Sequence, residues 1–437
     1  MPNQQSIVAP PIPRRRWRIA WLLGFGVLVN YFDRVNLSVS HAALVTSFGI
    51  SAVTFGYLAS AYNWTYALCQ LPIGVILDKF GVRRVGRISI FVWSLASFAA
   101  ALTPSVGGFF GARFLLGVGE ASTFPSNAKA VGYWFPRHER SLATAICDAA
   151  AKLASGIGVP VIGLFLLWVG WRWSFALTGV ISLVYLLLFW KIYRNPEDDP
   201  KLTTLERNYI CEDSPMPIAD NEKPASLPQL LSQRKVLGLA LGFGSYNYVF
   251  YLLLTWLPSY FASALHIDLL HSFLYTGVPW LFATATDFFI GGWLADSLIQ
   301  RGWNANRVRQ IILIGGTACG LGILGAANAH TATRALIWIS ISIGGLAAAA
   351  PIGWSVPALI VPRSSVGSVG GIVNFSCQVS GIAAQIATGY MVAANHQSYA
   401  WVFVVAAIYL AIGIGGYIFL MGRIEPIASL FNNALPE

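Results

Sequence analysis

Long apolar runs separated by short polar loops dominate this chain of 437 residues. Each run is roughly 20 residues long, which is the length that a helix rising about 1.5 Å per residue needs to cross a hydrocarbon core about 30 Å thick. The shorter alternating strands that are typical of membrane barrels do not occur in this pattern. The pattern predicts about twelve membrane-spanning helices, at 17–40, 52–77, 87–105, 107–134, 141–168, 173–192, 235–262, 271–299, 308–328, 334–360, 366–392 and 398–421.

One polar stretch divides these runs into two groups of six. It begins as NPEDDPKLTTLERNYICEDSP and contains few large apolar residues, which is typical of a linker with helical structure in part at most. The predicted organisation is a tail at 1–16, a first six-helix half at 17–192, the linker at 193–234, a second half at 235–421 and a tail at 422–437.

Composition and charge support a membrane protein and predict its orientation. The chain is 56% hydrophobic and 11% charged, against roughly 25% charged residues in soluble globular proteins. Its net charge of +10 could suggest a nucleic-acid partner, but the basic residues cluster in alternate loops. This positive-inside bias places both termini and the linker in the cytoplasm and gives no reason to expect nucleic acid. The five scattered cysteines form no CxxC pair, so we expect no metal site and no cofactor.

A motif that follows the second run is partly repeated after the eighth. The first copy, GVILDKFGVRR, contains Asp78, Arg83 and Arg84, and the second, GWLADSLIQRG, contains Asp296. Both place an acid four residues after a glycine and basic residues beyond it, which suits helix ends that approach closely and pair across the halves. We expect these four residues to act in gating, although an ordinary helix end explains a single copy as well.

Charged residues also interrupt the apolar runs themselves. Asp33 and Arg34 lie in the first run, and Glu120 lies in the fourth. A charge near the middle of a membrane helix costs a few kcal/mol or more, so such residues mark pathways for ions, protons or charged solutes. The sequence therefore predicts a transporter.

Several of these segments together resemble the anion:cation symporter family of the major facilitator superfamily. The resemblance rests on YFDRVNLS, GVILDKFGVRR, GARFLLGVGEASTFPS and WFPRHERS, and it extends over nearly the whole chain. It implies an all-α polytopic fold of 12 transmembrane helices in two six-helix halves, with a central site near the midplane. It also implies a secondary transporter of organic anions, such as sugar acids, aldarates or aromatic acids, in the bacterial cytoplasmic (inner) membrane.

Two acidic residues are candidates for proton coupling. Asp33 and Glu120 lie at mid-membrane depth in their runs, where burial favours a neutral carboxyl group and a nearby cation favours a carboxylate. The resemblance implies that both couple transport to protons. A fixed ion pair between Asp33 and Arg113 is the structural alternative. Arg113 precedes Glu120 by seven residues, on the same helix face, and is expected to be a charge partner in the proton path.

Arg34 is the candidate anchor for a substrate carboxylate. Its planar guanidinium is permanently charged and can bind a carboxylate with two parallel hydrogen bonds. A pair with Glu120 is the alternative, and both interpretations hold if substrate displaces the acid.

Lys152 distinguishes the fifth run from galactonate-type members of the family. It follows Asp148 by four residues, and Ala151 stands where a Gln would be expected in those members. In the cavity, Lys152 would hold a second carboxylate and favour a dicarboxylate substrate. The alternative is a self-satisfied Asp148–Lys152 pair on one helix face, which would favour monocarboxylic sugar acids.

Aromatic and amide side chains at similar depth complete the expected site. By resemblance, Tyr31, Tyr66, Trp354 and Asn374 occupy substrate-cavity positions, and depth alone adds Tyr62, Asn247 and Tyr251. Hydrogen bonding between helices is the alternative for each of them. The role of Asp287 in the eighth run stays open between a polar partner in the second half and proton coupling.

The expected partners are a small organic anion, protons and the lipid bilayer, and we expect a monomer. Exchange or export of the same anions is compatible with the sequence, which fixes neither direction nor coupling ion. An intramembrane enzyme would need a motif such as HExxH or a nucleophile with its base, and the spans contain none. A membrane sensor on a transporter fold is a remote alternative.

Overall fold

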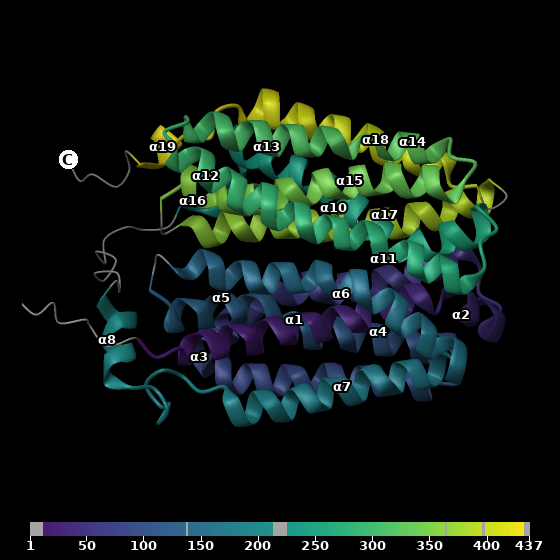
Figure 1. Ribbon diagram of the computed structural model, residues 1–437, viewed down its shortest axis with the longest axis horizontal. Coiled ribbons are helices and arrows are strands. Elements are labelled where there is room, and N and C mark those ends of the chain that lie inside the picture. Colours follow the sequence, from purple (N-terminus) through teal and green to yellow (C-terminus); the bar gives the residue numbers. More distant parts are fainter. Residues whose placement is uncertain (1–11, 137–138, 213–224, 363–364, 396–397, 432–437) are drawn as a thin grey trace, which may run out of the picture.

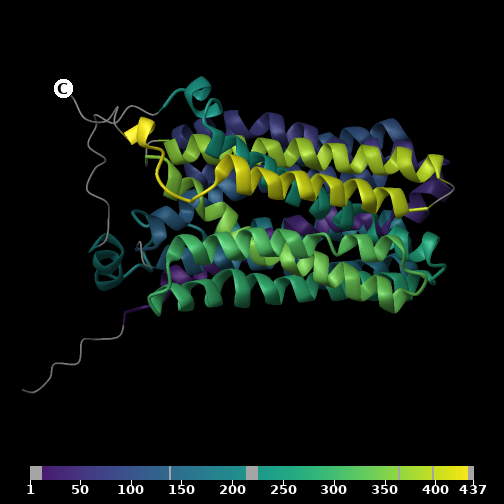
Figure 2. The same cartoon turned by 90° about the horizontal axis from the view of Figure 1, so that it is seen from above.

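The computed structural model describes residues 12–136, 139–212, 225–362, 365–395 and 398–431, and within them the chain forms helices and no strand. The helices lie nearly parallel in one elongated bundle (Figure 1). The view turned by 90° shows the same alignment and places the linker segments at one end (Figure 2).

Six spans make up the first half. They lie in α1 (Arg15–Val39), α3 (Ala52–Leu102), α4 (Val106–Glu120) continued by α5 (Thr123–Trp134), α6 (Arg140–Val169) and α7 (Trp171–Ile192). The long α3 contains two of them, because Gly81 adopts φ 74° and breaks the helix there. A positive φ of this kind is readily adopted by glycine alone, which explains why the turn of the GVILDKFGVRR motif falls at this residue.

The second half repeats this arrangement with more interruptions. Its spans are α10 (Arg234–Ser259) with η2 (Tyr260–Ala264), α11 (Leu269–Thr286) with η3 (Asp287–Leu294) and α12 (Ala295–Gln300), α13 (Ala305–Gly320) with α14 (Ile323–Ala327), α15 (Ala332–Ser355) with α16 (Pro357–Ile360), α17 (Val366–Ala394), and α18 (Ala400–Gly415) with η5 (Gly416–Met421). The π-helical turn η3 begins at Asp287 in the middle of its span, and such turns are frequent at functional sites.

Short helices outside the spans occupy the two ends of the bundle. The linker forms α8 (Thr204–Glu212) and α9 (Leu227–Leu231), α19 (Ala428–Phe431) follows the last span, and α2 (His41–Phe48) joins the first two spans. The helices agree with the predicted spans and with a linker that is helical in part, whereas α2 was not predicted. We call the end that carries α8 the terminal end and the end that carries α2 the distal end (Figure 1).

Eight of the described helices are long and apolar enough to cross a membrane, or nine if one bent helix pair counts as a span. The helix α1 is not among the eight. It carries Asn30, Asp33, Arg34 and Asn36 in its second half, and these polar residues lower its mean hydropathy.

The two halves meet most closely toward the distal end. The Ser38 hydroxyl on α1 donates to the Thr255 carbonyl on α10 at 2.7 Å. A Cβ atom on Gly277 of α11 would clash with the carbonyl oxygen of Gly156 on α6, so the backbones of these two helices touch. Close approach of this kind requires glycine.

Candidate functional site

Arg34 lies buried near the middle of α1 and pairs with Glu120, the last residue of α4. Its Nε donates to Glu120 Oε2 at 3.1 Å, and its Nη2 donates to Asn30 Oδ1, one turn back on the same helix, at 2.9 Å. Both charged side chains are almost fully removed from solvent. The structure therefore contains the Arg34–Glu120 pair that the sequence left as one of two interpretations.

Three tyrosines surround the Arg34 guanidinium. Its Cζ lies 4.5 Å from the ring centroid of Tyr31, 4.7 Å from that of Tyr62 and 5.5 Å from that of Tyr66. A contact of this kind between a cation and an aromatic face contributes about 0.5–1 kcal/mol at an exposed site and about 2 kcal/mol when water is excluded. The tyrosines hold the guanidinium in place without neutralising it, so the cation remains available to an anion.

Asp33 points away from Arg34, toward other helices of the first half. It accepts hydrogen bonds from the Ser97 hydroxyl on α3 at 2.7 Å and from the Ser182 hydroxyl on α7 at 3.3 Å. No ion pair with Arg113 forms in the described residues, so the fixed pair that the sequence offered as an alternative is absent from this structure. The hydroxyls satisfy this buried carboxylate in place of a cation.

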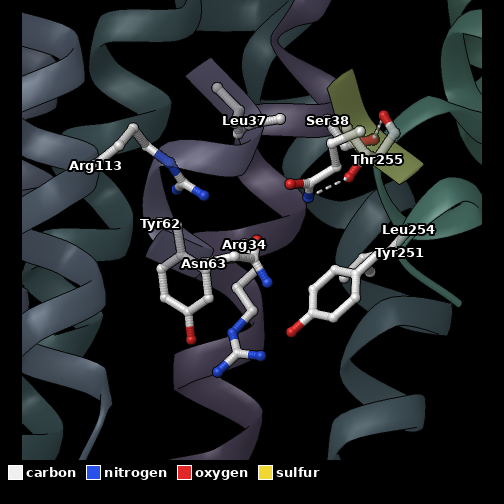
Figure 3. Close-up of a pocket in the computed structure, with 11 residues that line it drawn as sticks. Arg34, Leu37, Ser38, Tyr62, Asn63, Arg113, Tyr251, Leu254 and Thr255 are labelled. Atoms are coloured by element: carbon white, nitrogen blue, oxygen red, sulfur yellow. Dashed lines mark hydrogen bonds between the residues drawn. The ribbon is translucent and has the colours of Figure 1, made fainter. Parts of the chain in front are cut away.

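Arg113 is buried on α4 without an ion-pair partner in the described part of the chain. Its Nε and Nη1 atoms have no hydrogen-bond partner there, and its Cζ lies 5.5 Å from the Tyr62 ring. The expected role of Arg113 as a charge partner in the proton path is therefore not seen as an ion pair in these residues. Figure 3 shows the Arg113 guanidinium directed into the space beside Tyr62.

The Arg113 guanidinium lines a small cavity between the halves. This cavity extends toward the distal end. It has room for about one water molecule. Arg34 and Tyr62 lie on the first-half side and Tyr251 lies on the second-half side (Figure 3). The lining residues are Arg34, Leu37, Ser38, Ala59, Tyr62, Asn63, Arg113, Tyr251, Leu254, Thr255 and Gln385.

Lys152 binds two carboxylates that come from different halves. Its Nζ lies 2.7 Å from Asp148 Oδ2 on α6 and 2.6 Å from Asp287 Oδ2 on η3. The intrahelical Asp148–Lys152 pair is confirmed as a contact. Of the two alternatives left open for Asp287, the polar partner in the second half is not seen, because the residue that pairs with Asp287 is a lysine of the first half. We call these three residues the interface triad.

The two cationic centres lie at similar depth. The helices α1 and α6 run side by side in the same direction, with Gly24 against Ile146 and Gly158 against Phe32, which places Lys152 level with a point between Gly24 and Phe32. The Arg34 side chain reaches back toward that level to bond Asn30.

A chain of amide side chains links α3 to α17 across the halves. Asn63 donates to Gln378 Oε1 at 2.8 Å, and Asn374 donates to Gln70 Oε1 at 3.2 Å. The Tyr251 hydroxyl on α10 lies 3.4 Å from Gln378 Oε1. Asn374 and Tyr251 thus make the inter-helix hydrogen bonds that were the alternative to substrate contact.

Two other predicted substrate residues contact their own half. Asn247 on α10 donates to the Cys377 sulfur on α17 at 2.9 Å. Trp354 packs edge-on against Phe243, with ring centroids 4.8 Å apart. No described contact joins either of them to Arg34.

The predicted gating residues lie at the terminal end. Arg83 forms a 3.8 Å ion pair with Asp198 of the linker. Arg84 and Asp296 are exposed and make no ion pair with a described residue. The Asp78 side chain lies outside the described part of the structure. The expected pairing across the halves is not present among the described contacts.

Sequence reasoning missed the residues that complete the polar site, namely Asn30, Ser97, Ser182 and Gln70. Asn30 could have been found from its i−4 spacing to Arg34. The two serines had no such signal, because only the packing of α1, α3 and α7 brings them to Asp33.

The family model of the Major Facilitator Superfamily matches residues 23–385. The chain belongs to this superfamily. It is therefore a multi-pass membrane transporter and not an enzyme. The uncharacterized transporter YybO of Bacillus subtilis is 37% identical over 94% of this chain and 95% of YybO. The probable galactarate/D-glucarate transporter GarP of Escherichia coli is 31% identical over 94% of this chain and 95% of GarP.

The fold also agrees with a solved structure of the superfamily. A crystal structure of a D-xylose-proton symporter matches with a TM-score of 0.74 over 94% of this chain and 99% of that chain, at 15% sequence identity. Similarity at this level shows the shared arrangement of helices alone and confirms the predicted fold class.

Proposed function

We propose that this protein imports small organic dicarboxylates across the bacterial cytoplasmic membrane by proton-coupled alternating access. The observation that carries the proposal is the presence of two buried cations, Arg34 and Lys152, at similar depth between the helices. Each cation already holds a carboxylate of the protein, so each has the geometry that a substrate carboxylate requires. The similarity to GarP, whose name assigns two diacids to that protein, supports this substrate class.

Proton coupling is assigned to Asp33 and Glu120. Arg34 can pair with Glu120 or with substrate, and substrate binding leaves Glu120 buried without its cation. A buried carboxylate without a partner is costly, so a proton neutralises Glu120 in that state. Asp33, which is held by hydroxyl groups instead of a cation, is the second proton site. Arg113 supplies positive potential near both.

Alternating access is assigned to rocking of the halves. The basic loops favour a cytoplasmic terminal end, so contacts such as Ser38–Thr255 close the side that faces away from the cytoplasm. The motif residues Asp78, Arg83, Arg84 and Asp296 are proposed to act when the terminal end closes. The transporter is proposed to act as a monomer.

A monocarboxylate symporter is the second candidate function. The observation that favours it is that Lys152 already contacts two acids, which can satisfy it without a ligand. Exchange or export of the same anions would use the same residues.

Ligand-induced thermal stabilisation of the purified protein tests the substrate class. The panel contains galactarate, D-glucarate and phthalate as diacids, and galactonate, glucuronate and benzoate as monoacids. Each shift is measured against the ligand-free protein of the same variant. We expect the diacids to stabilise the wild type more than the monoacids do. The variant Asp148→Asn/Lys152→Met/Asp287→Asn, in which the triad has no charges, should lose this preference for diacids. Equal stabilisation by matched monoacids in both proteins would favour the monocarboxylate function.

A further inference from the structure

The interface triad carries one acidic group more than it has cations. Two aspartates share the single ammonium of Lys152. The buried parts of α1 and α4, by contrast, contain two acids, Asp33 and Glu120, and two arginines, Arg34 and Arg113. Additional uncompensated charge deep in a membrane protein is costly, so a further carboxylate arriving at the triad would favour a proton on the surplus aspartate.

The surroundings of the triad provide no second cation. Tyr246 on α10 and Tyr31 on α1 are close enough to interact electrostatically with members of the triad. The helix α15 packs against η3 through Pro351 near Gly291, and α11 contributes Thr286, whose hydroxyl donates to a backbone carbonyl of α15. Among the described residues, Lys152 is therefore the basic group that faces Asp287.

The three side chains of the triad are unequally exposed. The Asp148 side chain is 32% exposed, whereas those of Lys152 and Asp287 are 4% and 6% exposed. Asp148 lies one helical turn nearer the terminal end than Lys152, because α6 starts at that end. A proton can therefore enter from solvent at Asp148, and Asp287 is reached through the shared ammonium.

We propose that the Asp148–Asp287 pair takes up one proton when the second carboxylate of a diacid binds Lys152. This inference rests on the proposed function and adds a third proton site to it, at the boundary between the halves. The site makes diacid binding, and not monoacid binding, depend on a proton that Asp33 and Glu120 do not supply.

The charge balance of the step is simple. Before binding, two carboxylates and one ammonium carry a net charge of −1. A substrate carboxylate on Lys152 would make this −2, and one proton taken from solvent by either aspartate restores −1. No covalent bond other than the O–H bond forms, and the proton returns to solvent when the diacid leaves.

Galactarate and galactonate are a matched pair of probes, because they differ only in the second carboxylate. Their affinities for the full-length protein would be measured by isothermal titration from pH 5.5 to 8.5, where sugar-acid carboxylates are ionised. The slope of log affinity against pH counts the protons linked to binding. For the wild type we expect the galactarate slope to exceed the galactonate slope by about one proton.

Two variants test the assignment, each of which leaves Lys152 with one aspartate. Asp287→Asn and Asp148→Asn are each expected to abolish the slope difference and to strengthen galactarate binding at pH 8.5 about tenfold. Because the Asp148 side chain is partly exposed, we expect Asp148→Asn to fold. The pH slopes can then be measured on this variant if Asp287→Asn fails to fold. Glu197→Gln, an acid-to-amide change at an exposed linker position, should retain the difference.

The outcomes separate the two proposals. Galactarate binding with the same pH slope as galactonate in the wild type, or a slope difference that survives both aspartate variants, would overturn this inference alone. Binding of neither acid, nor of any other acid in the thermal panel, would overturn the proposed function and this inference with it.

Discussion

The two buried charge clusters of this transporter are built differently. Around Arg34 the charged side chains of the described residues belong to the first half, the acids and cations are equal in number, and tyrosine rings and serine hydroxyls contact Arg34 and Asp33. The interface triad has residues from both halves, has one acid in excess and includes one partly exposed side chain, that of Asp148. A cluster within one half can bind without sensing the position of the other half. A cluster shared between halves connects ligand, proton and conformation.

The strongest way to break this comparison is to remove the shared cation. Lys152→Met leaves Asp148 and Asp287 facing one another without an ammonium group, and breaking a buried pair of this kind costs about 3–5 kcal/mol of stability. We expect a clearly lower thermal unfolding midpoint in detergent. The triple variant Asp148→Asn/Lys152→Met/Asp287→Asn, which leaves the triad without charges, should recover most of the lost stability. If Lys152→Met is as stable as the triple variant, the ion pairs of the triad contribute little to the stability of the fold.

The next largest effect is expected at the first-half cluster. Arg34→Lys keeps the charge but loses the planar fork, so affinity for a carboxylate substrate should fall about 100-fold, equivalent to about 2.7 kcal/mol. The measurement is uptake of labelled galactarate into proteoliposomes. Arg301→Lys at an exposed loop is the matched control. Wild-type uptake by Arg34→Lys would remove Arg34 as the substrate anchor.

Glu120→Gln should separate transport from its driving force. The amide can still accept a hydrogen bond from Arg34, but it cannot carry a proton. We expect accumulation against a gradient to be lost while counterflow of labelled for unlabelled substrate continues. Both are read in the same proteoliposomes with and without an imposed pH gradient. Intact accumulation would take Glu120 out of the coupling path.

The smallest effect is expected for a hydroxyl group that binds Asp33, and it tests whether such hydroxyls hold this carboxylate. Ser97→Ala removes the 2.7 Å hydrogen bond to Asp33, and a hydrogen bond to a charged group contributes about 1.5–3 kcal/mol. Because Ser182 still donates to Asp33, we expect the low end of that range, as a modest fall in thermal stability with transport retained. Ser94→Ala, which removes a bond to its own helix backbone, is the control. Equal losses in both variants would contradict a specific role for Ser97.

Much of the candidate site was predictable from helical spacing. The four-residue spacing of Asp148 and Lys152 predicted a contact that the structure contains. Successive residues of a helix point about 100° apart, which is why Asp33 and Arg34 face different neighbours. Spacing along one helix says nothing about the partners on another. For that reason Asp287, whose partner turned out to be Lys152, stayed unassigned.

The sequence by itself determined the number and order of the spans, the two halves and the depth of the charged residues, because hydrophobic length and local periodicity are properties of each segment. Tertiary structure decided which acid faces which base. Asp33 meets hydroxyl groups instead of Arg113, and Lys152 joins the halves through Asp287. Such pairings depend on how helices far apart in the chain pack together, and side chains from separate helices become neighbours only when the bundle closes.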